Sequence, residues 1–136
     1  MTNINDIQSH KDLYPVLANY RDNFFRYFEE AVSDAREKNE KVDVSAFVKK
    51  YSQQIFDKIE AGIGALKRLE PTKDVEQLDV ETMFNEMITS YCEQNKNILP
   101  ELVDVEKEWQ KDFTEHIEAR KESIDERANE LKRAMK

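Results

Sequence analysis

Apolar residues recur every three or four positions along most of this 136-residue chain, which is the spacing that places them on one face of an α-helix. Four stretches show this spacing, and they predict helices over 13–38, over 44–69, from a start within 71–79 to about 96, and over 101–136. The connections are short, and short connections make successive helices antiparallel neighbours. The pattern therefore predicts one all-α domain over 1–136, an antiparallel four-helix bundle with an elongated C-terminal helix. An extended helical assembly or a dimer is the alternative architecture.

Polar residues mark where the first two helices begin. Ser9 with Asp12 three positions later resembles a capping box, in which two side chains satisfy backbone groups at a helix start. The segment 1–12 is polar, and we expect it to fray. Asp43 or Ser45 can cap the second helix, because both side chains accept hydrogen bonds from the first turn.

Each of the first two predicted helices holds an unusual group of residues. The run FFRYF at 24–28 widens the apolar stripe of the first helix, and we interpret it as core, with a partner-binding patch as the alternative.

The segment AGIGA at 61–65 holds both glycines of the protein, each of which costs a helix about 1 kcal/mol relative to alanine. Close approach of a neighbouring helix or a large aromatic side chain would offset that cost. A kink is the other explanation.

The fourth predicted helix is the longest, and it contains neither glycine nor proline. Its apolar positions keep helical spacing to the end of the chain, at Leu102, Val105, Trp109, Phe113, Ile117, Ile124, Ala128, Leu131 and Met135. At 1.5 Å per residue this helix would exceed the first by about two to three turns. We therefore predict that a segment of about 120–136 overhangs the bundle as a partner-binding or self-association element, because an exposed apolar stripe is commonly an interface. Its contact residues would be Ile124, Ala128, Leu131 and Met135.

Two large side chains of the fourth helix, Arg120 and Trp109, stand out in its sequence. Arg120 stands inside the apolar stripe, where a long basic side chain can extend its charge to solvent. It could instead form an ion pair with another helix or anchor an acidic group of a partner, and it is a candidate partner-binding residue for the last reason. Trp109, the one tryptophan, is expected in the core against the AGIGA segment.

The charge of the chain excludes some partners and suggests others. The 21 basic and 29 acidic residues give a net charge of -8, which disfavours direct binding to nucleic acid and attraction to an anionic membrane. The excess of acid is greatest over 71–100, where the net charge is -4. This segment offers a face to a partner with a basic surface, with ordinary solvated charge as the alternative. The acidic candidates are Glu76, Asp79, Glu81 and Glu86.

Histidine and cysteine, which supply many catalytic groups and metal ligands, are scarce in this chain. The two histidines are His10, in the polar start, and His116, which lacks the Glu three positions before it that a di-iron bundle requires. We expect His116 at the surface or the rim of the bundle and Cys92 buried as a structural thiol. No phosphate-binding loop, zinc motif, calcium loop or nucleophile elbow is present. The sequence therefore predicts a protein that is not an enzyme and binds no cofactor and no metal.

The cysteine count and the first residues bear on location. A single cysteine cannot form an internal disulfide, which favours a reducing compartment. The start of the chain lacks the basic and apolar segments of a secretory signal, and no apolar run approaches the ~20 residues that span a bilayer. We expect a cytoplasmic protein.

Three functions fit these observations. The first is a small acidic helical protein that acts by binding another protein, as an adaptor, chaperone, inhibitor or immunity-type factor, with a homodimer through the C-terminal helix as an alternative assembly. The second is an acidic DNA mimic that inhibits a nucleic-acid-binding protein through 71–100. The third is a sensor that holds a small ligand between its helices, with a pocket at the glycines. The overhanging helix and the missing catalytic motifs favour the first.

Overall fold

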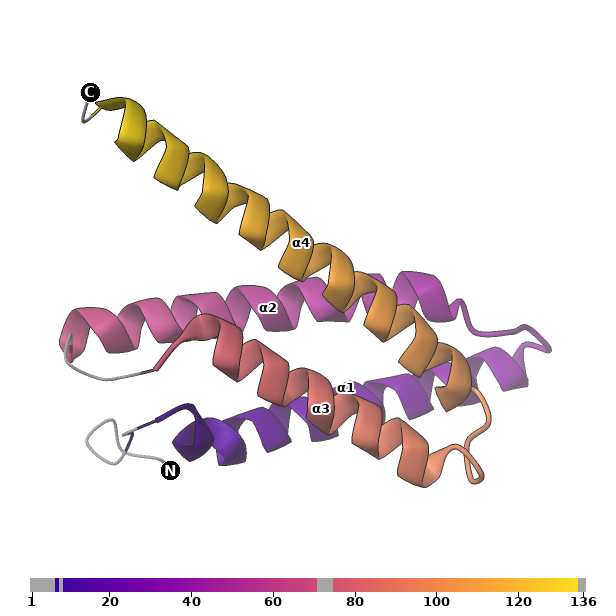
Figure 1. The fold of residues 1–136 in the computed structure, drawn as a ribbon. Helices are drawn as coiled ribbons and strands as arrows, with labels where there is room; N and C mark the ends of the chain where they lie inside the picture. Colours follow the sequence, from indigo (N-terminus) through magenta and orange to yellow (C-terminus); the bar gives the residue numbers. More distant parts are fainter. Residues whose placement is uncertain (1–6, 8, 71–74, 135–136) are drawn as a thin grey trace.

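The chain folds into four long helices preceded by a short 3₁₀ helix (Figure 1). The computed structural model describes residues 7, 9–70 and 75–134, with side chains through residue 121. Within these residues the elements are η2 (His10–Leu13), α1 (Tyr14–Glu37), α2 (Val44–Leu69), α3 (Gln77–Asn95) and α4 (Leu102–Ala134). None of them is a strand, and successive helices run in opposite directions. The predicted all-α four-helix fold is therefore confirmed.

Capping residues define the starts of the first elements. Asp43 caps α2, because its Oδ1 accepts a hydrogen bond from the backbone N–H of Ala46 at 3.1 Å. At the start of η2, the backbone N–H of Ser9 donates to Asp12 Oδ2 at 3.0 Å, as a capping box requires. These short-range contacts explain why the observed helix boundaries lie close to the predicted ones.

The described part of the N-terminal segment packs on the bundle, in contrast to the fraying expected over 1–12. Ile7 is buried and belongs to the hydrophobic core, and His10–Leu13 form η2. Removing one isoleucine side chain from water contributes roughly 2 kcal/mol, which favours this packing. Residues 1–6 and 8 lie outside the described residues.

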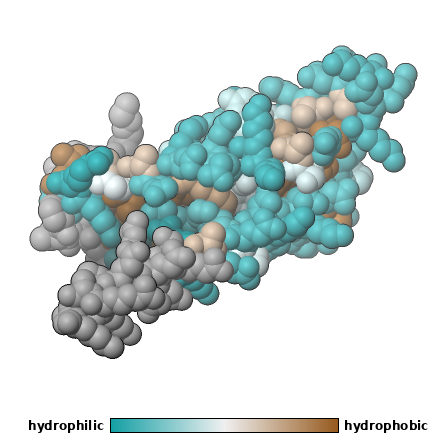
Figure 2. Space-filling view, turned by 90° about the horizontal axis from the view of Figure 1, so that it is seen from above, coloured by the Kyte–Doolittle hydropathy of each residue, from teal (hydrophilic) through white to brown (hydrophobic). Residues whose placement is uncertain are grey.

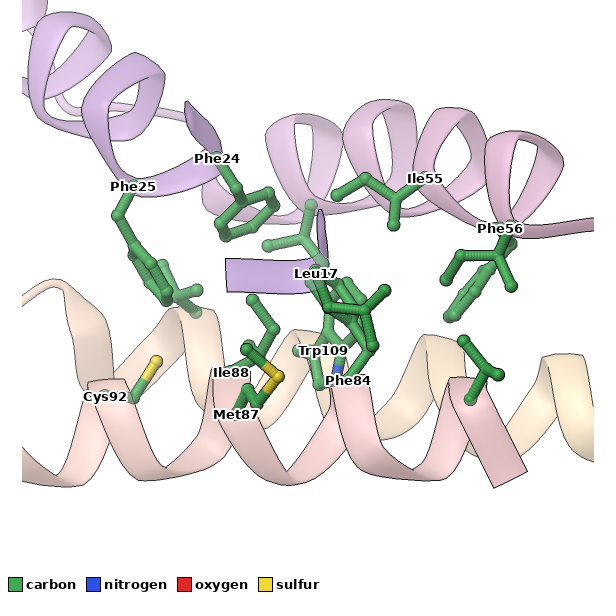
Figure 3. Close-up of a cluster of buried hydrophobic side chains, with 14 of the residues drawn as sticks. Leu17, Phe24, Phe25, Ile55, Phe56, Phe84, Met87, Ile88, Cys92 and Trp109 are labelled. Carbon is green, nitrogen blue, oxygen red and sulfur yellow. The ribbon is translucent and has the colours of Figure 1, made fainter. Parts of the chain in front are cut away.

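The core is centred on Trp109 of α4, which is completely buried. Its ring contacts one phenylalanine from each of the other helices, with centroid distances of 6.0 Å to Phe24 of α1, 5.5 Å to Phe56 of α2 and 5.5 Å to Phe84 of α3. Figure 3 shows these rings converging between the helices. Aromatic contacts at such distances add to the stabilisation from burial. The α4 segment around Trp109 therefore joins all four helices.

The aromatic run of α1 contributes to this core as predicted. Phe24, Phe25 and Phe28 are buried, whereas Tyr27 is exposed. Phe25 also stacks on Tyr91 of α3, with ring centroids 3.8 Å apart. The phenylalanines of the run are therefore occupied inside the bundle and do not form a surface patch.

The two glycines of α2 do not accommodate a close neighbour. No atom lies within 4 Å of the position that a Cβ would take at Gly62 or Gly64. Trp109, the aromatic residue expected against this segment, contacts Phe56 of α2 instead. The prediction that close packing explains the glycines is therefore wrong.

The outer surface is largely polar, in keeping with 37% charged residues. Figure 2 shows one face of the molecule as mostly hydrophilic, with hydrophobic residues visible between the polar ones. Among the described residues, the exposed large apolar side chains include Leu69 at the end of α2 and Ile98 in the connection between α3 and α4. Single exposed apolar residues of this kind are ordinary on protein surfaces.

Candidate functional site

The most unusual residue in the described part of the core is a carboxylate. Glu81 of α3 is 0% exposed, and helical spacing places it on the face that also carries Phe84 and Ile88. A charged side chain is costly to bury unless it is paired and hydrogen-bonded. The partners of Glu81 therefore show how the surrounding structure stabilises the charge.

Three side chains satisfy the Glu81 carboxylate. Its Oε1 accepts hydrogen bonds from Gln77 Nε2 at 2.7 Å and from Arg120 Nη1 at 2.8 Å. Its Oε2 accepts one from His116 Nε2 at 2.6 Å. Gln77 lies one turn before Glu81 on α3, and His116 lies one turn before Arg120 on α4. We call this cluster the Glu81 junction and define it as Gln77, Glu81, His116 and Arg120.

Both basic residues of the Glu81 junction lie at the rim of the bundle. The side chains of His116 and Arg120 are 25% and 29% exposed, so each bonds to the buried carboxylate and is also partly accessible to solvent. The His116 ring also stacks on Phe56 of α2, with ring centroids 4.1 Å apart and planes 7° apart. The junction therefore connects α2, α3 and α4. For Arg120, the inter-helix ion pair is the alternative that the structure supports.

The Glu81 junction lies where α4 leaves the other helices. α4 packs on α2 and α3, crosses them obliquely and then projects beyond them (Figure 1). Arg120 bonds to Glu81 in the N-terminal turns of α3. Because α4 runs toward that end of α3, little of α3 remains for the rest of α4 to pack against. About 14 residues of α4 follow Arg120, a length of ~21 Å. We call this segment, 121–134, the α4 arm.

The α4 arm corresponds to the overhang predicted over about 120–136. α4 has 33 residues and α1 has 24, so α4 is longer by about two and a half turns, as expected. The backbone of the arm is helical, but its side chains beyond residue 121 lie outside the described residues. This applies to all four predicted contact residues, Ile124, Ala128, Leu131 and Met135. Their role in binding stays a prediction from the sequence.

The four acidic candidates of 71–100 do not form one accessible face. Glu81 is buried in the junction, which corrects the expectation that it meets a partner at the surface. Glu76 lies 3.5 Å from Lys67 of α2 in an exposed ion pair, and Asp79 and Glu86 are exposed. The anionic surface is therefore weaker than the sequence alone predicts, which reduces the support for DNA mimicry.

Two further polar contacts join α4 to its neighbours. Trp109 Nε1 donates a hydrogen bond to Asn85 Oδ1 of α3 at 2.8 Å. Ser52 Oγ of α2 lies 3.5 Å from Asp112 Oδ2, and burial raises the pKa of the Asp112 carboxyl. Each contact forms only when its α4 side chain faces the neighbouring helix. Together with the Glu81 junction, they define the rotation of α4 about its axis.

The single thiol is held in an unreactive form. Cys92 is completely buried, as expected, and burial, together with the nearby carboxylates of Glu106 and Glu93, raises its pKa to about 12. A nucleophilic cysteine requires the thiolate, which is scarce at neutral pH when the pKa is so high. Cys92 is therefore part of the core packing.

The described residues also bear on a metal site and on a membrane span. In the described ranges, no three His, Cys, Asp or Glu side chains are grouped as the ligands of a metal ion would be. Of the helices described, none has an apolar stretch of the length needed to cross a membrane.

The sequence contains a signal for Glu81 that is easily missed. Glu81, Phe84 and Ile88 are spaced by three and four positions, so Glu81 occupies a core position of α3 just as Arg120 occupies one of α4. Two opposite charges inside two apolar stripes are candidates for a buried pair. Arg120 can be recognised in the sequence but its partner cannot, because 29 acidic residues offer too many choices.

Comparison with protein-family models, with curated proteins and with solved structures finds no match. Function is therefore inferred from the Glu81 junction and the α4 arm.

Proposed function

We propose that this chain is a non-enzymatic protein that acts by binding another protein through the α4 arm. The observation that supports this best is the projection of α4 beyond the helices on which it packs (Figure 1). An isolated helix of about 14 residues is marginally stable in water, and most helical stability in proteins comes from packing of one face. Contact with a partner would supply that packing to the arm.

The sequence of the arm indicates the kind of surface that it would bind. The spacing of Ile124, Ala128 and Leu131 predicts one apolar stripe, and such a stripe is commonly buried in an apolar groove of another protein. Charged residues of both signs occupy most other positions of 121–136. The expected complement is a partner groove with an apolar centre and a rim of mixed charge.

The Glu81 junction would assist binding by holding the base of the arm. His116 and Arg120 bond to one carboxylate of α3, and His116 also stacks on α2. These contacts restrict the direction in which α4 leaves the bundle. A binding element that is already oriented loses less conformational freedom when it meets its partner, so its affinity is higher.

Capture of proteins from a lysate of the source organism tests the proposal when three forms of the chain are compared. Leu131→Asp places a charge in the predicted stripe of the arm. Ile98→Asp makes the same change at a residue that is 82% exposed and lies outside the arm. We expect one stoichiometric partner, identified by mass spectrometry, with the wild type and with Ile98→Asp, and about tenfold less of it with Leu131→Asp.

Sedimentation equilibrium of the purified chain separates a partner protein from a second copy. We expect the free chain to be monomeric at micromolar concentration. Recovery of the bait alone, or a dimer that Leu131→Asp dissociates, would contradict the proposal that the arm binds a different protein.

A further inference from the structure

An apolar cavity of about 270 Å³ lies between the N-terminal part of α1 and the C-terminal half of α2. Its floor consists of buried core side chains, namely Leu17, Ile59, Ile63, Leu66 and Val80. Gly62 forms part of its wall, and no atom lies within 4 Å of the position that a Cβ would take there. The glycine therefore leaves open a recess that reaches the core.

One charged side chain, Lys58 of α2, is among the described residues that line this cavity. Lys58 is exposed, and its Nζ lies 5.7 Å from the centre of the Tyr20 ring, which also lines the cavity. No described carboxylate forms an ion pair with Lys58. The residues one turn away on α2, Gln54 and Gly62, carry no charge that could form one. The cavity therefore combines an apolar interior with a cation at its edge that forms no ion pair with a described carboxylate.

We propose that this cavity binds an aliphatic carboxylate, with the hydrocarbon chain inside the cavity and the carboxylate beside Lys58. Each methylene buried among the apolar side chains strengthens binding about fourfold. The ammonium group of Lys58 can donate a charge-assisted hydrogen bond to the carboxylate. The site is separate from the α4 arm, so the proposal does not depend on binding of a protein partner.

The size of the cavity favours a single chain over larger occupants. Its volume lies at the lower limit of small-molecule sites, which begin at about 300 Å³. One turn of an α-helix, ~10 Å wide and 5.4 Å long, requires about 420 Å³. A whole helical turn of another protein is therefore larger than the cavity, whereas an extended hydrocarbon chain is much narrower.

Titration of the full chain with decanoate, below the concentration at which it forms micelles, tests the proposal. The protein has two glycines, whose backbone amides are readily followed in ¹H–¹⁵N spectra. We expect saturable one-site binding that shifts the Gly62 amide. Octanoate, which has two fewer methylenes, should bind about fifteenfold more weakly. Decyltrimethylammonium, which carries the opposite charge on a chain of the same length, should bind at least about threefold more weakly than decanoate.

Two pairs of variants assign the binding to this cavity. Gly62→Leu fills it, and Gly64→Leu makes the same change at a neighbouring glycine that does not line it. Lys58→Met removes the cation, and Lys49→Met removes an exposed lysine of the same helix that is outside the cavity. We expect decanoate to bind about tenfold more weakly to Gly62→Leu and about threefold more weakly to Lys58→Met, with both controls within about twofold of the wild type.

Three results would each overturn the proposal. They are the absence of saturable binding, equal affinities of Gly62→Leu and Gly64→Leu, and binding of decyltrimethylammonium that matches or exceeds that of decanoate. If Gly62→Leu does not fold, the comparison of Lys58→Met with Lys49→Met decides, because both lysines are exposed and their loss leaves the core intact.

Discussion

Glu81 of α3 and Arg120 of α4 form an ion pair at 2.8 Å in which the Glu81 side chain is completely buried and the Arg120 side chain is 29% exposed. The two groups therefore differ in whether water can hydrate them when their partner is removed. Water can hydrate a partly exposed guanidinium, whereas a buried carboxylate has no access to it. The pair is also the last hydrogen bond between α4 and another helix before the α4 arm, within the side chains described. It holds the base of the arm on the bundle.

Loss of Arg120 should destabilise the fold more than loss of Glu81. Arg120→Met leaves the buried carboxylate with His116 and Gln77 alone, and we expect the free energy of unfolding to fall by about 2 to 3 kcal/mol. Glu81→Gln keeps the volume and removes the buried charge, so the expected loss is about 1 kcal/mol. Urea denaturation followed by Trp109 fluorescence measures both changes.

Arg36→Met is the matched control for Arg120→Met. It breaks a pair of similar length, 2.9 Å to Glu101, but the Arg36 side chain is 62% exposed. Exposed pairs contribute at most about 1 kcal/mol, so we expect a correspondingly small effect. Equal losses from Arg36→Met and Arg120→Met would show that burial of the Glu81 carboxylate does not matter.

Replacement of either glycine of α2 by alanine should stabilise the protein. A Cβ at Gly62 or Gly64 would meet no atom within 4 Å, and neither glycine has a positive φ. Alanine is favoured over glycine in a helix by about 1 kcal/mol, so each substitution should raise the free energy of unfolding by about that amount. Thermal and urea denaturation check this. A decrease in stability would mean that close packing at this segment exists after all.

The thiol of Cys92 should resist alkylation while the chain is folded. Burial raises its pKa to about 12, so its thiolate at pH 8 is rarer by orders of magnitude than that of a cysteine in an unfolded chain. We expect iodoacetamide to react with the folded protein at least about a hundredfold more slowly than with the protein in urea. Mass spectrometry of timed samples gives both rates. Similar rates would place Cys92 at the surface.

Neutralisation of Glu106 should stabilise the protein at neutral pH and have little effect in acid. Burial and the neighbouring Glu93 carboxylate raise the pKa of Glu106. A carboxyl group with a higher pKa in the folded chain binds protons more readily when folded, so its ionisation lowers stability. This loss is present above the raised pKa and disappears as the pH falls below the ordinary range of glutamate. Glu106→Gln should therefore be more stable than the wild type at pH 7, with the difference lost near pH 3.5.

Asp104→Asn, at an exposed carboxyl group of the same helix, is the control for the Glu106 prediction. Urea denaturation of the three proteins at both pH values gives the comparison. A Glu106→Gln variant that is less stable than the wild type at pH 7 would refute the assigned direction of the pKa shift.

The helices could be predicted from the sequence because the information for them is local. Apolar spacing and the Asp43 cap define α2 at Val44–Leu69, the limits that the pattern predicts. The length of α4 follows from the absence of glycine and proline over its extent. The aromatic core is in keeping with the size and spacing of the phenylalanines of α1, which place them on a broad apolar stripe.

The candidate site could be predicted only in part, because it depends on which side chains meet across helices. Arg120 is recognisable as a charge in an apolar stripe, but its partner Glu81 is one of 29 acidic residues. The prediction for the glycines is wrong for a physical reason. The cost of Gly62 in a helix implies some compensation, but it does not distinguish close packing from an open cavity.

Removal of the α4 arm separates binding from folding and tests the proposed function most directly. A chain that ends at Lys121 keeps the Glu81 junction and Trp109 but lacks all of the arm except its first residue. We expect its free energy of unfolding to stay within about 0.5 kcal/mol of the full chain, because the described core residues of α4 all precede Lys121. We also expect capture of the partner protein to be abolished. A loss of several kcal/mol, or capture equal to that of the full chain, would contradict the assignment of the arm as a binding element outside the bundle.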